Sequence, residues 1–268
     1  MPDRSHRVAA AVCYNRFVAW IFDLDGVLWL GGDPIPGSTD AVAKVRDGGH
    51  RVLFLTNNSS RPVSAIITKL TDIGIAAEPD EVVTSAQAAA SLLESGTTAL
   101  VCAGVGVREA LDERGVRAID EGSADAVIVG YHEEFDYHRL TAAYRAVCGG
   151  ARLIGTNDDA TYPTPDGPIP GGGAILAAVT TATGSDAEVA GKPYEPMAEL
   201  VRQRLGDDVD GAILVGDRPS TDGLMARRLE VTFALVLTGV TGAGDVPDDP
   251  PPDHVADDLR ALVDELLD

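Results

Sequence analysis

The 268-residue sequence is poor in cysteine, lysine and aromatic residues, and each shortage excludes some classes of protein. Its three cysteines, Cys13, Cys102 and Cys148, are odd in number and widely spaced, so they indicate neither a disulfide framework nor a CxxC metal site. We therefore expect a protein of the reducing cytoplasm, with Cys102 and Cys148 as small core residues. Aromatic residues make up only 5%, so the core must rest on Val, Leu, Ile and Ala.

Positive charge is the next shortage. The chain has 21 Lys and Arg against 42 Asp and Glu, which gives a net charge of −21. A surface this acidic repels phosphate backbones and anionic bilayers, so we expect neither nucleic acid nor a membrane as a partner. Asp outnumbers Glu by 29 to 13, and only three basic residues are lysines. This pattern is typical of a high-salt cytoplasm, where ions screen carboxylate repulsion, but ordinary solubility charge explains it as well.

Long apolar runs are also missing. The run at residues 8–13 is far shorter than the roughly 20 residues that a membrane span needs. Arg4 and Arg7 precede this run, as in a signal peptide, but Asn15 and Arg16 interrupt it. We interpret residues 1–15 as a loose N-terminal extension or an overlong start.

Short apolar segments alternate with helical patterns along the rest of the chain. Strands are predicted at 17–22, 51–55, 82–83, 98–102, 126–129, 152–154, 212–215 and 232–237. Helices are predicted at 38–47, 62–73, 85–94, 107–114, 136–147, 174–183, 195–205, 221–229 and 257–267, the first with Ser38 as its N-cap. Segments 31–37, 161–173 and 245–253 are predicted loops. This order indicates an α/β protein with a doubly wound, mostly parallel sheet.

Polar residues follow four of these segments, and open parallel sheets collect their sites at the carboxyl ends of strands. The first group is Asp23-Leu24-Asp25-Gly26. Carboxylates two residues apart on a strand share a face. Their repulsion is offset by a shared proton or by a cation such as Mg²⁺. An Asx-type turn is the alternative explanation, because Asp and Gly are common turn residues.

Uncharged polar residues and a lysine make up the second and third groups. Thr56, Asn57 and Asn58 follow the strand RVLFL. Their hydroxyl, amides and backbone N–H groups can bind phosphate oxygens, or they can cap the next helix. Lys192 lies between Gly191 and Pro193 in a chain that otherwise prefers arginine. A compact ammonium suits a phosphate oxygen and a carboxylate together, although a surface lysine is the simpler interpretation.

The fourth group contains two more carboxylates. Asp217 follows the strand at 212–215, and Asp222 lies in the first turn of the next helix. Both can point at one cation site, and hard oxygen ligands suit Mg²⁺. Alternatively, Asp222 only stabilises the N-terminus of that helix.

The four groups in this order resemble the haloacid dehalogenase (HAD) superfamily, whose four motifs match at Asp23/Asp25, Thr56, Lys192 and Asp217/Asp222. The strings FDLDGV, LTNNSS, AGKP and VGDRPSTD resemble its NagD-like subfamily (class IIA, the 4-nitrophenyl phosphatase type), as do TNDDATYPTPDGPIPGGGAI and LVLTGVT. The resemblance covers residues 17–268. The chain departs from the pattern at Asp158, where Pro is usual, and at Ser220, where Asp is common.

The resemblance implies a Rossmann-like core interrupted by an inserted α/β cap domain (C2 type). The core would comprise residues 16–87 and 188–268, and the cap residues 88–187. The cap would lie over the active site and supply substrate selectivity, excluding bulky or protein substrates.

The resemblance also implies Mg²⁺-dependent hydrolysis of a small phosphate monoester. Asp23 would attack phosphorus to form an aspartyl-phosphate, and Asp25 would serve as general acid and then base. The metal would be held by Asp23, the backbone carbonyl of Asp25 and Asp217, with Asp222 orienting the metal ligands. The phosphate would be bound by Thr56, Asn57, Asn58 and Lys192. Asn157 and Asp159 would contact substrate, or would only form a turn.

Several alternatives stay open at this stage. The aspartyl-phosphate could be passed to a sugar hydroxyl, as in a phosphomutase, or the chain could be a non-catalytic protein that binds a phosphate ligand. The substrate itself is not specified: sugar phosphates, glycerol phosphate and nucleotides all fit. Relatives of this type also form cap-to-cap dimers, so a homodimer is possible. His132 and His138 are expected to be surface residues.

Overall fold

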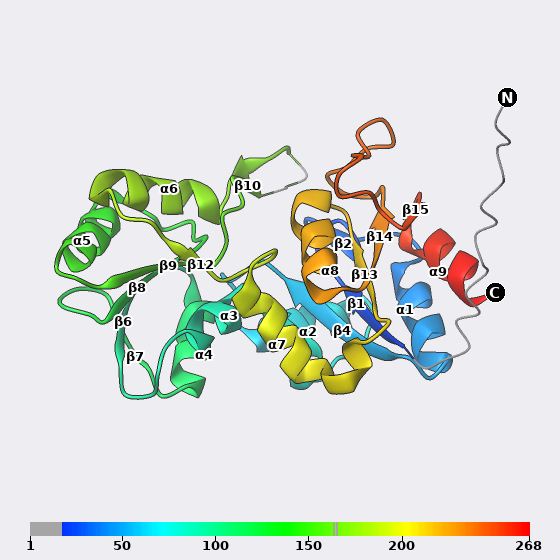
Figure 1. The fold of residues 1–268 in the computed structure, drawn as a ribbon, viewed down its shortest axis with the longest axis horizontal. Helices are drawn as coiled ribbons and strands as arrows, with labels where there is room; N and C mark the ends of the chain where they lie inside the picture. Colours follow the sequence, from blue (N-terminus) through cyan, green and yellow to red (C-terminus); the bar gives the residue numbers. More distant parts are fainter. Residues whose placement is uncertain (1–17, 163, 165) are drawn as a thin grey trace, which may run out of the picture.

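The computed structural model describes residues 18–162, 164 and 166–268, and these residues form two α/β units, each built around a parallel sheet (Figure 1). The predicted N-terminal extension and Cys13 lie outside the described residues. Among the described helices, none is long and apolar enough to cross a membrane.

The larger sheet has six parallel strands in the order β15-β14-β13-β1-β4-β5. Its strands are β1 (Ala19–Phe22), β4 (Arg51–Thr56), β5 (Val82–Thr84), β13 (Ile213–Gly216), β14 (Thr232–Val236) and β15 (His254–Ala256). The central strands are buried on both faces, which explains why β1 and β13 read as continuous apolar runs.

Helices cover both faces of this sheet. Trp20 and Phe22 of β1 face a core shared with α1 (Ser38–Asp47), α2 (Val63–Asp72) and α9 (Leu259–Leu267). Ala19 and Ile21 face the opposite core, shared with α3 (Ser85–Ser91), α7 (Glu195–Leu205) and α8 (Leu224–Leu229). This alternation follows from the two-residue period of a strand.

The second sheet lies in the chain between β5 and β13 of the first. Its five parallel strands run in the order β12-β9-β8-β6-β7. They are β6 (Thr98–Cys102), β7 (Arg117–Ile119), β8 (Ala126–Val129), β9 (Arg152–Gly155) and β12 (Glu188–Val189), accompanied by α4 (Val105–Glu113), α5 (Tyr137–Cys148) and α6 (Gly172–Thr183). The predicted α/β core with an inserted α/β cap is confirmed, and the residue limits of the two domains stay a prediction.

Several local predictions were wrong. Gly37, at φ 83°, is the N-cap of α1; Ser38 is already helical, and its hydroxyl donates to the Leu28 carbonyl at 3.0 Å. Cys148 is exposed because it lies at the last turn of α5, whereas Cys102 is buried as expected. His132 is buried and not a surface residue, because its ring packs edge-on against Phe135.

Short elements of two to five residues were also missed, because they contain too few residues to show a period. Two hairpins lie in or beside predicted loops: β2 (Trp29–Leu30) with β3 (Asp33–Pro34), and β10 (Thr161–Tyr162) with β11 (Ile169–Pro170). Short helical turns occur at Pro79–Glu81 and Gly206–Val209, and the helix predicted at 221–229 begins as a short helical turn at Pro219–Gly223. In Figure 1 the β10 hairpin extends from the inserted unit towards the first sheet.

The burial of His132 predicts a pH-dependent stability. Its Nδ1 lies 3.0 Å from the Gly130 carbonyl oxygen, so Nδ1 carries the proton, and the buried Nε2 has no partner among the described residues. Burial lowers the pKa of His132, so the unfolded chain binds this proton more readily. As pH falls through about 6.5, the ordinary pKa of histidine, the folded state should lose stability.

We expect His132→Asn to reduce this acid-induced loss, measured as the difference in free energy of unfolding in urea between pH 7.5 and 5.5. His138→Asn is the matched control, because 71% of the His138 side chain is exposed. Equal pH dependence in wild type and His132→Asn would contradict the prediction.

Candidate active site

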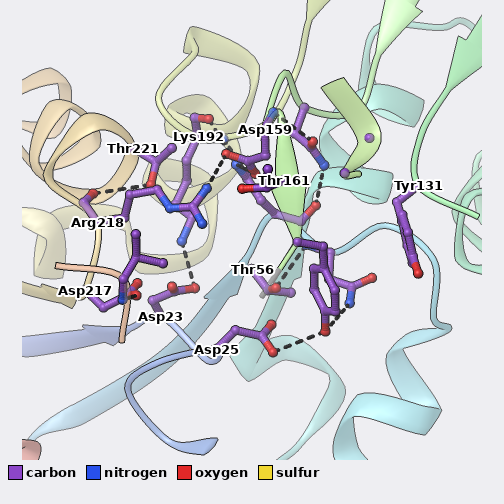
Figure 2. A pocket seen from close by; sticks show the side chains of 17 residues that line it. Asp23, Asp25, Thr56, Tyr131, Asp159, Thr161, Lys192, Asp217, Arg218 and Thr221 are labelled. Atoms are coloured by element: carbon purple, nitrogen blue, oxygen red, sulfur yellow. Dashed lines mark hydrogen bonds and ion pairs between the residues drawn. The ribbon is translucent and has the colours of Figure 1, made fainter. Parts of the chain in front are cut away.

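Three adjacent strands carry the predicted site residues to one edge of the larger sheet. Asp23 follows β1, Thr56 ends β4 and Asp217 follows β13. Phe22 pairs with Val215 on one side and with Phe54 on the other, so the strands end together. The parallel sheet therefore brings the first, second and fourth groups into one place, as Figure 2 shows.

Three buried carboxylates form a cluster at this edge. Oxygen atoms of Asp23, Asp217 and Asp222 all lie within 4.8 Å of one another. Burial raises the pKa of Asp217 to about 6, and the neighbouring Asp222 adds to the rise. Buried carboxylates at this spacing repel each other, and a divalent cation offsets that repulsion. The oxygen-only donor set fits Mg²⁺.

Close backbone packing aims Asp217 into the cluster. The backbone N–H of Val240 donates to its Oδ2 at 2.6 Å. A Cβ atom at Gly239 or at Gly26 would collide with the Asp217 carboxylate, so both positions need glycine. The LVLTGVT segment, which is part of the sequence resemblance, contains Gly239 and Val240. Its role in the structure is this close contact with Asp217.

Lys192 is buried between two of these carboxylates. Its Nζ lies 2.8 Å from Asp23 Oδ1 and 2.7 Å from Asp222 Oδ1, and the lysine is 2% exposed. Burial alone would lower the pKa of Lys192, but the charges of Asp222 and Asp23 outweigh it and raise the pKa. The ammonium therefore stays charged, and the alternative of a surface lysine is excluded.

The ion pairs of Lys192 also affect the pKa of Asp23 and the hydrogen bonding of Asp222. Burial raises the pKa of Asp23 well above its ordinary value, Lys192 opposes this rise, and Asp222 and Asp217 add to it. Asp222 also accepts the backbone N–H of Arg218 at 3.1 Å. Both Asp222 oxygens are thus hydrogen-bonded to protein donors, so this residue helps to hold Lys192 in place.

Asp25 has different surroundings from Asp23. Its Oδ1 accepts from the Trp29 indole N–H at 3.0 Å and from the Tyr162 hydroxyl at 3.3 Å. Burial raises the pKa of Asp25 and so favours its protonated form, while the charge of Lys69 opposes this rise. A carboxyl group that holds a proton at a cavity edge is suited to general acid catalysis. The dashed line from Asp25 in Figure 2 marks its bond to the tyrosine of the inserted unit.

The polar loop after β4 is largely occupied by its own hydrogen bonds. Asn57 Oδ1 accepts the Lys192 backbone N–H at 2.7 Å, and its Nδ2 donates to Asp159 and to the Lys192 carbonyl. Thr56 Oγ1 accepts from the Asn58 backbone at 3.0 Å, and Asn58 Oδ1 accepts from the Ser60 backbone and hydroxyl. The hydroxyl proton of Thr56 remains able to donate. Contact of these residues with phosphate stays a prediction.

Asn157 and Asp159 connect the two units. The Asn157 side chain donates to the Asn57 carbonyl at 2.7 Å and accepts the Asp159 backbone N–H at 3.2 Å. Asp159 Oδ1 lies 3.2 Å from a guanidinium nitrogen of Arg218 on the core side. This segment therefore forms a turn and also lies at the site. The two interpretations of Asn157 and Asp159, as turn residues and as residues that contact substrate, do not exclude each other.

Most of these residues line one cavity of about 70 Å³. Its lining comprises Asp23, Asp25, Thr56, Asn57, Asn58, Tyr131, Asn157, Asp159, Thr161, Tyr162, Gly171, Gly172, Lys192, Asp217, Arg218, Thr221 and Val240. Asp222 is fully buried and is not among these lining residues. Sequence reasoning missed Tyr131, Tyr162 and Arg218, although the last two stand inside strings that carried the resemblance, and tyrosines are rare here.

Comparison with known proteins agrees with this arrangement. Residues 20–117 match the haloacid dehalogenase-like hydrolase family, and residues 189–262 match the HAD-hydrolase-like family. The acid sugar phosphatase of Staphylococcus haemolyticus is 34% identical over 256 residues, covering 94% of this chain and 97% of that protein.

Solved structures are also similar. The glycerol phosphate phosphatase of Mycobacterium tuberculosis in complex with magnesium superposes with a TM-score of 0.84 and 34% identity, over 92% of this chain and 77% of that one. The p-nitrophenyl phosphatase of Archaeoglobus fulgidus gives a TM-score of 0.86 and 30% identity, over 93% and 99% of the two chains.

Proposed function

Because this chain belongs to the haloacid dehalogenase-like hydrolases and is a phosphatase of that type, we propose that it hydrolyses small phosphate monoesters through an aspartyl-phosphate on Asp23. The observation that carries this proposal is the contrast between two carboxyl groups of one cavity. Asp23 is ion-paired with Lys192, whereas Asp25 is held by uncharged donors. The Lys192 ammonium favours the anionic form of Asp23, as a nucleophile requires, and burial favours the protonated form of Asp25, as a general acid requires.

The reaction proceeds in two displacements. A carboxylate oxygen of Asp23 attacks phosphorus, the ester P–O bond breaks, and Asp25 gives its proton to the departing alcohol oxygen. Asp25 then accepts a proton from a water molecule, which attacks the phosphoryl group and releases inorganic phosphate with a free Asp23. Thr56, Asn57, Asn58 and Lys192 bind the phosphate oxygens.

The cluster of carboxylates would hold Mg²⁺. Asp23, Asp217 and the backbone carbonyl of Asp25 are the proposed ligands, and Asp222 orients them through Lys192 and Arg218. When bound, the ion supplies positive charge that offsets repulsion between the carboxylates and the phosphoryl oxygens. We also propose that Asn157 and Asp159 position the cap over the substrate. The cytoplasmic location and the homodimer stay predictions.

The substrate class is tested by phosphate release over a metabolite panel. We expect turnover of 4-nitrophenyl phosphate and of sugar or glycerol phosphates, which the names of the relatives suggest. The panel is run at low and at molar salt, since higher activity in molar salt would support the high-salt interpretation of the acidic composition. Isomer formation without free phosphate would instead identify a phosphomutase, and binding without turnover a non-catalytic protein.

Removal of divalent metal should abolish activity, and added Mg²⁺ should restore it. We further expect Mg²⁺ to raise the melting temperature of the wild type, because binding to the folded state alone stabilises it. Asp217→Asn should lose most of this thermal shift, since it removes a proposed ligand. Asp245→Asn, an exposed residue outside the site, is the charge-matched control. An unchanged shift in Asp217→Asn would exclude that residue as a ligand.

A further inference from the structure

We propose that a second cavity beside the active site binds a second anionic group of the substrate. The preferred substrates are then phosphate esters whose alcohol carries a carboxylate or another phosphate. This inference rests on the proposed phosphatase function and specifies its substrate class.

The second cavity has a volume of about 340 Å³, against about 70 Å³ for the first. The two cavities share Asp25, Thr56, Asn58 and Tyr162. Asp25 is the proposed donor to the leaving oxygen, so the alcohol part of a substrate begins beside this residue. The second cavity therefore provides a space into which that alcohol can extend from the phosphate.

Two cations line this cavity. Arg61 follows the polar loop after β4 and is exposed; within residues 18–162, 164 and 166–268 its guanidinium makes neither an ion pair nor a hydrogen bond. Lys69 of α2 is half-buried, donates to the Gly31 carbonyl at 2.8 Å and lies 3.9 Å above the Trp29 ring. Burial lowers the pKa of Lys69, the Asp25 carboxylate opposes this, and Arg61 lowers the pKa further, so the charges of Arg61 and Lys69 lie close together.

The absence of a carboxylate partner for Arg61 and Lys69 among the described residues is unusual in so acidic a chain. Carboxylates outnumber basic residues by 42 to 21, yet no described carboxylate lies within 4.0 Å of the charged nitrogens of Arg61 or Lys69. Apolar walls from Leu24, Trp29 and Ile66 reduce the competition from water. Neighbouring cations held this way attract an anion, and a guanidinium can bind carboxylate or phosphate through two hydrogen bonds.

A purely structural role accounts for only one of the two cations. Lys69 contacts Trp29, and Trp29 donates to Asp25, so Lys69 can also act as a positioning residue for the general acid. Arg61 takes no part in that chain of contacts. Arg61 is therefore the residue whose replacement separates anion binding from positioning.

The test compares kcat/KM for matched substrates that differ in the second anionic group. One pair is glycerol 3-phosphate and 3-phosphoglycerate, and the other is fructose 6-phosphate and fructose 1,6-bisphosphate. We expect the wild type to prefer the member with the second anion by about ten-fold or more, the worth of a charged hydrogen bond. Arg61→Gln should lower this preference about ten-fold, and Arg61→Lys should retain most of it.

Arg145→Gln is the control, because it removes the same charge from an exposed residue on α5 that lines neither cavity. Equal kcat/KM for both members of each pair in the wild type, or an undiminished preference in Arg61→Gln, would overturn the inference. If Arg61→Gln loses the preference in only one of the two pairs, the second anion of that pair, carboxylate or phosphate, is the one that the cavity accepts.

Binding separates failure of this inference from failure of the proposed function. Isothermal titration of 3-phosphoglycerate and glycerol 3-phosphate into Asp23→Asn requires no turnover. Tighter binding of 3-phosphoglycerate, lost when Arg61→Gln is added, supports the second anion site even if the wild type hydrolyses neither compound. Equal affinities overturn it even if the wild type hydrolyses both.

Discussion

Asp23→Asn is expected to lower kcat for 4-nitrophenyl phosphate by at least about 10⁴-fold, the scale seen when a nucleophile is removed from a catalytic unit. The asparagine amide has the shape of the carboxylate but lacks its nucleophilicity, and it removes one of the two ion pairs of Lys192. Phosphate release in the presence of Mg²⁺ measures the effect, with circular dichroism to confirm the fold.

Asp33→Asn is the control for this variant, since Asp33 lies exposed in β3 and its replacement changes the net charge equally. Its activity should equal that of the wild type. Mass spectrometry of acid-quenched wild-type enzyme should locate the phosphoryl group on Asp23. Retained activity in Asp23→Asn, or a phosphoryl group on another residue, would refute the assigned nucleophile.

Lys192→Met is expected to give the largest loss of stability, about 3–5 kcal/mol in the free energy of unfolding at pH 7.5, as for buried pairs that lose one partner. The replacement leaves Asp23 and Asp222 as buried carboxylates without their common cation, while Asp217 remains close to both. Urea denaturation in the absence of divalent metal measures this loss. Activity should fall as well, because the proposed phosphate contact disappears.

Lys44→Met tests whether the loss comes from burial. Lys44 also bridges two carboxylates, Asp264 at 2.8 Å and Asp268 at 2.6 Å, but on the surface. Exposed pairs contribute about 0–1 kcal/mol, so this control should change stability little. Adding Asp222→Asn to Lys192→Met should restore part of the lost stability, because one unpaired charge is removed. Similar losses in Lys192→Met and Lys44→Met would contradict the role assigned to the buried pair.

The strands were easier to predict than the short connecting elements. Because helices cover both faces of the sheet, β1, β4 and β13 consist of apolar runs. Such runs can be recognised as buried strands from the sequence alone. The hairpins β2–β3 and β10–β11 have strands of two residues, and pairing between distant parts of the chain, not local pattern, makes them strands. Ser38 was misassigned for a similar reason, since its hydroxyl bonds to Leu28 ten residues earlier.

The order of four polar groups along the chain determined by itself the family, the α/β core with its inserted cap, and the edge of the sheet at which Asp23, Thr56 and Asp217 meet. The family and the inserted cap follow from the resemblance of these groups to the HAD motifs, whereas the sheet and its edge follow from local burial patterns and from the geometry of parallel strands. The tertiary structure alone decided that Lys192 is buried between Asp23 and Asp222, that Trp29 and Tyr162 hold Asp25, and that Arg61 and Lys69 share a cavity. Each of these depends on side chains from separate elements whose distances and shared burial no local pattern encodes.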